Sequence, residues 1–284
     1  MKNFLLVAFA LFSLASCDMV KPPYQTNNNG EIDTAKEDSV VVKVRKVLLE
    51  DYTGHTCGNC PKAAKVADEQ KEIHKEKLIV MGVHAGGFAI PELPDYPADY
   101  RTPEGNELDQ FFGISGVGNP NGMINRIDYP ASGHVKGHTS WAGILAAELA
   151  KPMQAWLTIE PQYNTSNRKL DVTVKTEFIT ALSGDVKLAV FLVEDSVISD
   201  QKNYLANPTH VTTYVHRHML RKSFSGSAFG ELIAANPQPS ETTVDKSYST
   251  TVSSNYDDKH CYVVALIYNA ATYEVIQAEE KKIK

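Results

Sequence analysis

The stretch from Gly54 to Gln70 reads GHTCGNCPKAAKVADEQ, and it holds two cysteines, Cys57 and Cys60, with only two residues between them. Helical periodicity begins at Cys60 and continues to about Lys75. A cysteine that precedes a helix has its thiolate facing unpaired backbone N–H groups and the positive end of the helix dipole, so its pKa falls. Cys60, one turn in, would lie beneath Cys57 and could resolve a mixed disulfide. The pair is therefore a candidate redox site, with a structural disulfide and half of a zinc site as the alternatives.

The segments on either side of this stretch predict an α/β fold. A run rich in β-branched residues precedes it, from Val40 to Tyr52, and the apolar run LIVMGVH from Leu78 to His84 follows the helix as a buried strand. An irregular excursion from Ala85 to Arg101 then collects glycine, proline and aromatic residues, and loops this long usually serve a purpose. The next helix has Thr102 as its N-cap and Gly113 as its stop.

The composition changes after Pro152. A helical pattern from Thr139 to Ala150 ends just before this proline, and beyond it short runs of β-branched and aromatic residues recur between turn signals. The runs are AWLTIE, KLDVTVKTEF, VKLAVFLVED, TTYVHRHML, TTVDKSYSTTVS, HCYVVALIYN and TYEVIQAEEKKI. Strands of this number and spacing predict an all-β sandwich of immunoglobulin-like architecture. We therefore expect a first domain over residues 40–152 and a β-sandwich domain over residues 153–284.

The N-terminus, MKNFLLVAFALFSLASC, predicts a lipoprotein signal peptide over residues 1–16. It has one basic residue, an apolar run, and small residues before Cys17. The last four residues, LASC, form a bacterial lipobox, so we expect the Cys17 thiol to carry a diacylglycerol after cleavage. Each buried methylene of an acyl chain contributes roughly 0.8 kcal/mol, and two or more chains give a lasting anchor. The polar stretch over residues 17–39 is typical of a flexible tether between lipid and fold.

The apolar segments and the net charge limit the kinds of protein that this sequence can encode. After the signal peptide, the sequence has no segment approaching the ~20 apolar residues that a spanning helix needs. The chain carries 28 basic and 34 acidic side chains, for a formal charge of −6, and this balance disfavours nucleic acid as a partner because phosphate binding needs a basic surface. We expect a protein that lipid holds on a membrane without crossing it, and we expect no cofactor.

Two further residues fit a thiol-exchange site: Asp51 lies six positions before Cys57, and Pro120 precedes the strand NGMINRI. With them the first domain resembles thioredoxin, in which a Cys-x-x-Cys pair caps the first long helix, an acid six residues upstream assists proton transfer, and a cis-proline faces the disulfide. The resemblance implies that Cys57 attacks and Cys60 resolves. It also implies that Asp51 moves protons and Pro120 shapes the substrate groove. The sequence departs from thioredoxin at Thr56, where that family has tryptophan, and in the Gly-Asn between the cysteines, so the strength of reduction or oxidation does not follow.

Most of the chain beyond the signal peptide also resembles a narrower family, the twenty-eight-kilodalton outer-membrane lipoproteins of anaerobic Gram-negative bacteria, which join a thioredoxin-like domain to a β-sandwich. The matching stretches are EDYTGHTCGNCP, VHAGGF, NPNGMINR and YVHRHMLR, spread from Glu50 to Arg221. The resemblance implies an outer-membrane address facing the surface or the periplasm, and a role in adhesion or receptor-like binding. It carries no defined reaction.

Histidines in the stretch THVTTYVHRHMLR suggest a metal site only weakly. His216 and His218 would share one face of a strand, but such a pair falls short of the ligand count that a transition metal needs. The simpler interpretation is that Tyr214 and these two histidines form an interfacial face that packs on the first domain. Arg217 and Arg221 would then lie in water. We therefore expect no metal site.

Three single residues have simpler explanations than chemistry. We expect His55 to be an exposed loop residue rather than a third zinc ligand, and His84 to be a hydrogen-bonded wall residue rather than a base. Cys261 alternates with Val263 and Ala265 on one face of a strand, which is typical of a buried small hydrophobe. As the odd cysteine, it is also the only candidate for an intermolecular bond.

Two classes of function remain open. As an enzyme, the protein would exchange disulfides in envelope proteins. As a binding protein, it would use the sandwich and the excursion from Ala85 to Arg101 as a contact surface for envelope or host proteins. In that case the cysteine pair would be a structural disulfide at the base of the excursion.

Overall fold

The computed structural model describes residues 42–284, and Lys43–Lys284 form one compact unit. The predicted signal peptide, the acylated Cys17 and the tether lie outside the described residues. Within the described range, no helix combines the length and the apolar character needed to span a membrane.

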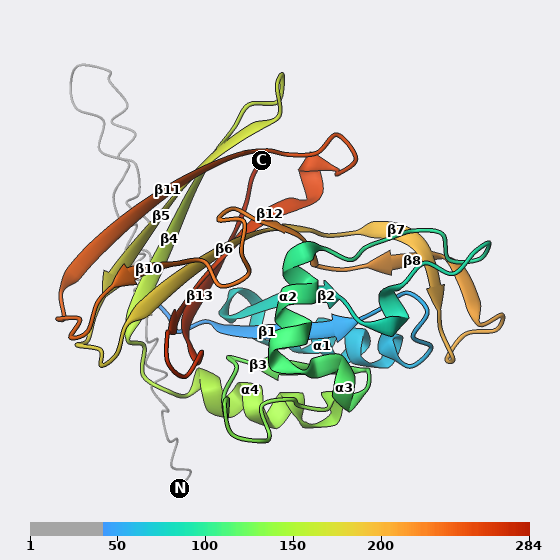
Figure 1. The fold of residues 1–284 in the computed structure, drawn as a ribbon, viewed down its shortest axis with the longest axis horizontal. Helices are drawn as coiled ribbons and strands as arrows, with labels where there is room; N and C mark the ends of the chain where they lie inside the picture. Colours follow the sequence, from blue (N-terminus) through green and yellow to red (C-terminus); the bar gives the residue numbers. More distant parts are fainter. Residues whose placement is uncertain (1–41) are drawn as a thin grey trace, which may run out of the picture. The chain divides into compact units, whose positions relative to one another are not determined.

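Four α-helices and thirteen strands make up the described fold (Figure 1). The helices are α1 (Cys60–His74), α2 (Pro103–Phe112), α3 (Ile114–Val117) and α4 (Trp141–Leu149). The strands are β1 (Val47–Thr53), β2 (Leu78–His84), β3 (Asn121–Ile124), β4 (Ala155–Tyr163), β5 (Lys169–Phe178), β6 (Val186–Glu194), β7 (Val197–Lys202), β8 (His210–His216), β9 (Met219–Ser223), β10 (Glu231–Ala234), β11 (Thr242–Thr251), β12 (Cys261–Asn269) and β13 (Val275–Lys282).

The predicted strand, helix, strand unit is confirmed as β1, α1 and β2, but the first strand begins at Val47, later than the run predicted from Val40. The two strands run parallel, and β3 pairs antiparallel with the other side of β1, with Asp51 opposite Gly122. The capping signals of α2 also hold: the Thr102 hydroxyl accepts a hydrogen bond from the backbone N–H of Gly105 at 2.9 Å, and Gly113 ends the helix in the left-handed conformation. This part of the chain has the strand and helix order expected of a thioredoxin-like unit.

One large sheet runs through both predicted domains. Its strand order is β13-β12-β6-β9-β2-β1-β3, and β10 pairs with β6 off this path. The junction is the pairing of Gly82 on β2 with Met219 on β9, where the Gly82 N–H donates to the His218 carbonyl at 2.8 Å. A β-carbon at Gly82 would lie 3.0 Å from the Arg217 carbonyl oxygen, so the close approach favours glycine. The predicted boundary at Pro152 falls between α4 and β4, and independent folding of the two segments stays a prediction.

The large sheet is covered on both faces. On the first three strands, one face packs on α2 through residues such as Leu48, and the other packs on α1 and α4 through residues such as Leu49. The central strands β6 and β12 continue this arrangement: Phe191 belongs to the cluster under α2, whereas Val190 packs on β4 and β5. Burial on both faces explains why both strands are nearly continuous apolar runs.

A second, three-stranded sheet with the order β11-β5-β4 covers part of the large sheet (Figure 1). A two-stranded hairpin, β7 and β8, follows the C-terminal end of β6 and extends toward the N-terminus of α1. The fold is therefore mixed α/β with mostly β-strands, and the immunoglobulin-like assignment of its second half stays a prediction.

The strand predictions for the second half need correction at one point. The run TTYVHRHML was expected to form one strand, but β8 ends at His216 and β9 begins at Met219. His218 has a φ of 49°, a left-handed conformation that interrupts an extended strand, so β8 and β9 pair with different neighbours. The expected shared face of His216 and His218 is therefore wrong. The strands β7 and β10 were also not predicted.

A buried ion pair ties the turn after β3 to β1. The Arg126 guanidinium donates to both carboxylate oxygens of Glu50, at 2.9 and 2.7 Å, and both side chains are fully buried. The guanidinium carbon also lies 5.2 Å from the ring centroid of Phe112 and 5.5 Å from that of Tyr268. This bidentate contact joins β1, α2 and β12 around one charge.

Candidate functional site

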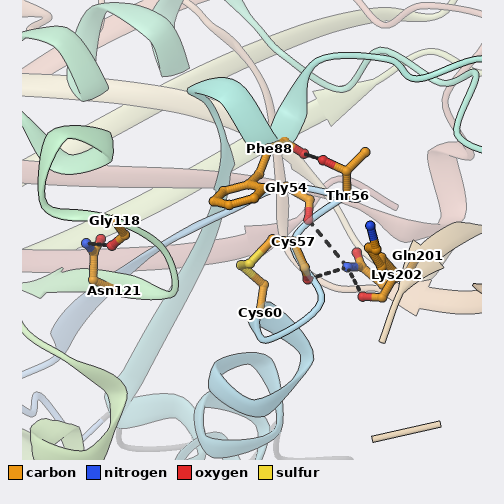
Figure 2. Close-up of a disulfide and its surroundings, with 9 residues drawn as sticks. All are labelled: Gly54, Thr56, Cys57, Cys60, Phe88, Gly118, Asn121, Gln201 and Lys202. Carbon is orange, nitrogen blue, oxygen red and sulfur yellow. Dashed lines mark hydrogen bonds between the residues drawn. A yellow bond between two sulfur atoms is a disulfide. The ribbon is translucent and has the colours of Figure 1, made fainter. Parts of the chain in front are cut away.

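Cys57 and Cys60 form a disulfide at the N-terminus of α1 (Figure 2). The Cys57 N–H donates to the Gly54 carbonyl at 3.0 Å, and the Cys60 N–H donates to the Cys57 carbonyl at 3.2 Å, so the loop turns tightly into the helix. Each cysteine is only 2% exposed. Exchange with a protein substrate requires access to a sulfur atom, so the residues that cover this disulfide matter as much as the cysteines.

The cover is the β7–β8 hairpin with its connection, residues 197–216, which we call the arm. The Lys202 N–H donates to the His55 carbonyl at 2.8 Å, and the Tyr204 N–H donates to the Gly58 carbonyl at 2.8 Å. Figure 2 shows the Gln201 side-chain amide beside the cysteine loop, where it donates to the Cys57 carbonyl at 3.1 Å. The arm thus holds the cysteine loop mainly by its backbone.

The contact between the arm and Gly58 is close. A β-carbon at Gly58 would lie 2.5 Å from the Tyr204 ring, so any larger residue at position 58 would push this ring away. Neither Gln201 nor Tyr204 could be identified from the sequence, because the connection QKNYLANPTH shows no apolar periodicity that would predict a buried contact.

The excursion over residues 85–101 supplies a second cover. The Phe88 carbonyl accepts hydrogen bonds from the Thr56 N–H at 3.1 Å and from the Thr56 hydroxyl at 2.9 Å. A β-carbon at Gly54 would lie 2.2 Å from the same carbonyl oxygen, which makes glycine necessary there. Thr56, the residue that replaces thioredoxin's tryptophan, therefore anchors the excursion to the cysteine loop.

Asp51 lies on β1 and lines a small cavity together with Cys60. The residue is 6% exposed, and its Oδ1 atom is buried without a hydrogen-bond partner in the protein. Burial, and secondarily the negative charge of Asp68, raises the pKa of Asp51 from 3.8 to about 7. A carboxyl group with such a pKa can both accept and release a proton near neutral pH.

Pro120 lies at the same end of β1 as the cysteines. The register sets Asn121, the first residue of β3, opposite Tyr52, so Pro120 comes at the point where β1 runs into the cysteine loop. The Asn119–Pro120 peptide bond is cis, as are four other X–Pro bonds in the described residues. The Asn121 side-chain amide donates to the carbonyls of Gly118 and Ile114 and fixes the turn before the strand.

Histidine rings gather between the excursion and the arm. The ring centroids of His84 and His216 are 5.5 Å apart, and Tyr100 lies 5.3 Å from each. Burial lowers the pKa of three imidazoles in this region: that of His216 falls to about 4, that of His84 falls well below 6.5, and that of His55 also falls. These rings are therefore neutral at pH 7.

The expectation that His55 is exposed is wrong, because His55 is 1% exposed beneath the excursion and the arm. His84 is a wall residue as expected, but its Nε2 atom is buried without a hydrogen-bond partner. Among residues 42–284, no group of three or more histidine, cysteine, aspartate or glutamate side chains is arranged to hold a metal ion.

Of the other predicted residues, Arg217 lines the cavity that Asp51 and Cys60 also line, whereas Cys261 lies in a separate core. Arg221 was expected in water, but it is largely buried and paired with Glu194 at 2.7 Å, because β9 joins the large sheet. Arg217 is exposed and paired with Asp195. Cys261 is a free, fully buried cysteine in the core beneath β4 and β5, as its alternation indicates. In this fold its sulfur has no surface from which to form an intermolecular bond.

Comparisons with known proteins agree with an envelope protein. The family model described as outer membrane protein Omp28 matches residues 105–284. Among solved structures, HBP35 of Porphyromonas gingivalis matches with a TM-score of 0.66 and 16% identity, covering 85% of this chain and 76% of that chain. A protein from Agrobacterium tumefaciens matches with a TM-score of 0.52 and 12% identity, covering 86% and 96%. These two likenesses concern the fold alone.

A domain of the outer membrane lipoprotein Omp28 from Porphyromonas gingivalis shares 21% identity over 47% of this chain and 91% of that chain, with a TM-score of 0.32, which is too low to support an argument about the fold. The search of curated proteins gave no match.

Proposed function

We propose that this chain, which belongs to the Omp28 family of outer membrane proteins, exchanges thiols and disulfides with other envelope proteins through Cys57 and Cys60. We further propose that a lipid on Cys17 holds it at the outer membrane. Adhesion to host or envelope proteins is the alternative.

The observation that supports exchange is the unpaired acid beside the disulfide. Asp51 is buried in the cavity that Cys60 lines, with a pKa raised to about 7. Burying a carboxyl group without a partner costs free energy, and a disulfide that only cross-links the chain has no use for it. A dithiol that must lose a proton near neutral pH needs such a group as a proton acceptor. The arrangement therefore suits thiol–disulfide exchange.

The residues have complementary roles in this chemistry. In the reduced protein, the Cys57 thiolate attacks one sulfur of a substrate disulfide, forming a mixed disulfide and releasing one substrate thiolate, which takes up a proton. Cys60 gives its proton to Asp51, and its thiolate attacks the Cys57 sulfur. The Cys57–Cys60 disulfide forms, the mixed disulfide breaks, and the second substrate thiolate leaves. Two electrons pass from the protein to the substrate, and the reverse sequence oxidises a substrate dithiol.

Exchange also requires the arm to move, because both cysteines are 2% exposed. The arm holds the loop through hydrogen bonds from Gln201, Lys202 and Tyr204, and a net contribution of about 1 kcal/mol per bond is typical. Removing one such bond should therefore raise the population of the open form about fivefold. Reduction of the disulfide would become faster in the same proportion if opening limits the reaction.

Redox measurements on the purified protein test the proposed function. We expect a reduction potential between about −270 and −120 mV, the range of exchange catalysts, and a Cys57 thiol pKa below about 8.5. The measurements are equilibration with glutathione or dithiothreitol, and alkylation rates of the reduced protein as a function of pH. A Cys60→Ser variant isolates the Cys57 thiol. A potential below about −300 mV, together with a Cys57 no more reactive than a peptide thiol, would reject exchange.

Variants of the arm test whether its opening limits the rate at which the disulfide is reduced. Gln201→Ala should speed reduction by dithiothreitol at least about fivefold, because the amide that donates to the carbonyls of Cys57 at 3.1 Å and Gly54 at 3.4 Å is lost. Leu205→Ala is the matched control, since this side chain lies in the same connection and is exposed. Equal reduction rates in Gln201→Ala, Leu205→Ala and wild type would show that the arm does not limit access.

The second candidate function is binding with a purely structural disulfide. It is favoured by the burial of both cysteines under the arm and by the attachment of the excursion to Thr56. In that case the cysteine pair holds the base of the excursion, whose exposed Phe88, Ile90 and Leu93 would contact a partner protein. The low potential described above is the result that this candidate predicts.

A further inference from the structure

We propose that Asp68 carries protons between Asp51 and the solvent through water held in the cavity beneath Cys60. This inference deepens the proposed exchange function and rests on it. Asp68 acts through Asp51 and touches neither sulfur in the reaction, so it is a positioning residue.

The spacing along α1 places Asp68 on the cysteine side of the helix. Cys60, Ala64 and Asp68 are separated by four residues each, so they follow one face of the helix, and all three line the same cavity. Eight residues of helix rise about 12 Å, which puts Asp68 two turns beyond the sulfur. Asp51 enters the cavity from the neighbouring strand β1.

The cavity has room for water and a group that needs it. Its volume is about 30 Å³, which exceeds the roughly 10–15 Å³ that a cavity needs to hold water. Asp51 Oδ1 is buried with no protein partner, whereas buried polar atoms normally have one. Water in the cavity would supply this partner and bridge toward Asp68.

Asp68 is also where the cavity meets the surface. An open groove of about 500 Å³ lies between α1 and the arm, and it shares with the cavity the residues Pro61, Asp68, Tyr214 and Arg217. Asp51 does not line this groove. Of the four shared residues, Asp68 alone has a carboxylate, so it is the group there that can take a proton from Asp51 and pass it to the groove.

The charges around both acids fit this route. Asp68 is exposed on one side, and the partial desolvation of its carboxyl group raises its pKa, as do the negative charges of Asp195 and Glu72, whereas Arg217 and His218 lower it. Asp68 in turn raises the pKa of Asp51, so the two carboxylates interact across the cavity. Burial and these two carboxylates raise the pKa of Tyr214 to about 12, so its hydroxyl stays neutral and polar in the wall.

The proton balance is simple. The Cys60 thiol loses its proton to Asp51, and the Cys60 thiolate then attacks Cys57. Asp51 is left protonated and must lose this proton before the next cycle. The proton moves from Asp51 through cavity water to the Asp68 carboxylate and from there to bulk water. Proton uptake during reduction of the disulfide follows the same path in reverse.

The test compares Asp68→Asn with Glu69→Gln, a matched control on the adjacent, exposed position of α1 whose side chain pairs with Lys65. Infrared spectroscopy of the oxidised protein follows protonation of Asp51 through its carboxyl stretch, assigned with Asp51→Asn. We expect Asp68→Asn to lower the titration midpoint of Asp51, because a like charge is removed, and Glu69→Gln to leave it unchanged. A midpoint that stays in place in Asp68→Asn overturns the proposal.

Kinetics provide the second readout. In Asp68→Asn we expect kcat for disulfide exchange to fall roughly tenfold, less than the ~10²–10⁴ of a direct acid–base group, with KM unchanged. The rate–pH profile should shift with the midpoint, and Asp68→Glu should restore both. An unchanged profile in Asp68→Asn overturns the relay. If wild type shows no exchange, the proposed function fails, and the infrared midpoint alone then decides whether Asp68 and Asp51 are connected.

Discussion

Replacing Asp51 with asparagine should stabilise the oxidised protein at neutral and alkaline pH. The pKa of Asp51 is raised from 3.8 to about 7, so the folded state binds a proton more tightly than the unfolded chain. For a raised pKa the contribution of protonation to folding is fully present below pH 3.8. It is lost as the pH rises toward 7. Above pH 7 the folded state bears the whole cost of a buried carboxylate.

The magnitude follows from the shift. A difference of about three pKa units at ~1.36 kcal/mol each corresponds to about 4 kcal/mol, an upper limit because cavity water and local relaxation reduce the cost. Asp51→Asn cannot ionise, so its gain in the free energy of unfolding over wild type should grow between pH 4 and pH 7. We expect a difference of about 2–4 kcal/mol between the gains at pH 8 and at pH 4.

The assay is urea denaturation of the oxidised protein at several pH values from 4 to 8, followed by circular dichroism. Asp245→Asn is the matched control, because this aspartate lies exposed on β11 and its replacement should change the free energy of unfolding little at any pH. A stability difference between Asp51→Asn and wild type that is the same at pH 4 and pH 8 would refute the reasoning, whatever its sign.

Two other predictions concern the ion pair and the anchor. Glu50→Gln should lower the free energy of unfolding by about 3–5 kcal/mol because it leaves the fully buried Arg126 without its partner, and the double variant Glu50→Met with Arg126→Met should recover much of this loss in urea denaturation; equal losses in both proteins would contradict it. Cys17→Ala should abolish incorporation of a fatty-acid probe in cells and release the protein from the membrane fraction, and label retained in this variant would disprove acylation.

Local patterns in the sequence were sufficient for the first half of the fold. The alternation of helix and strand periods predicted β1, α1 and β2. The capping residues Thr102 and Gly113 predicted the two ends of α2. The resemblance to thioredoxin, through the spacing of Asp51 from the cysteines, implied the acid that the structure places in a cavity with Cys60. These helices and strands depend on interactions between residues that are close in the sequence, so local patterns are enough to predict them.

Features that depend on distant residues were decided only by the tertiary structure. The apolar runs of β6 and β12 predicted buried strands, but apolar side chains do not specify which sheet or helix covers each face. The arm was missed because it binds the cysteine loop largely through backbone hydrogen bonds, which any sequence can make. For the same reason His55 looked exposed: its own neighbours are polar, and the residues that bury it come from the excursion and from the arm, about 150 positions away. Sequence alone therefore determined that a Cys-x-x-Cys pair begins a helix, and tertiary packing decided that the pair lies beneath a cover from the second half of the chain.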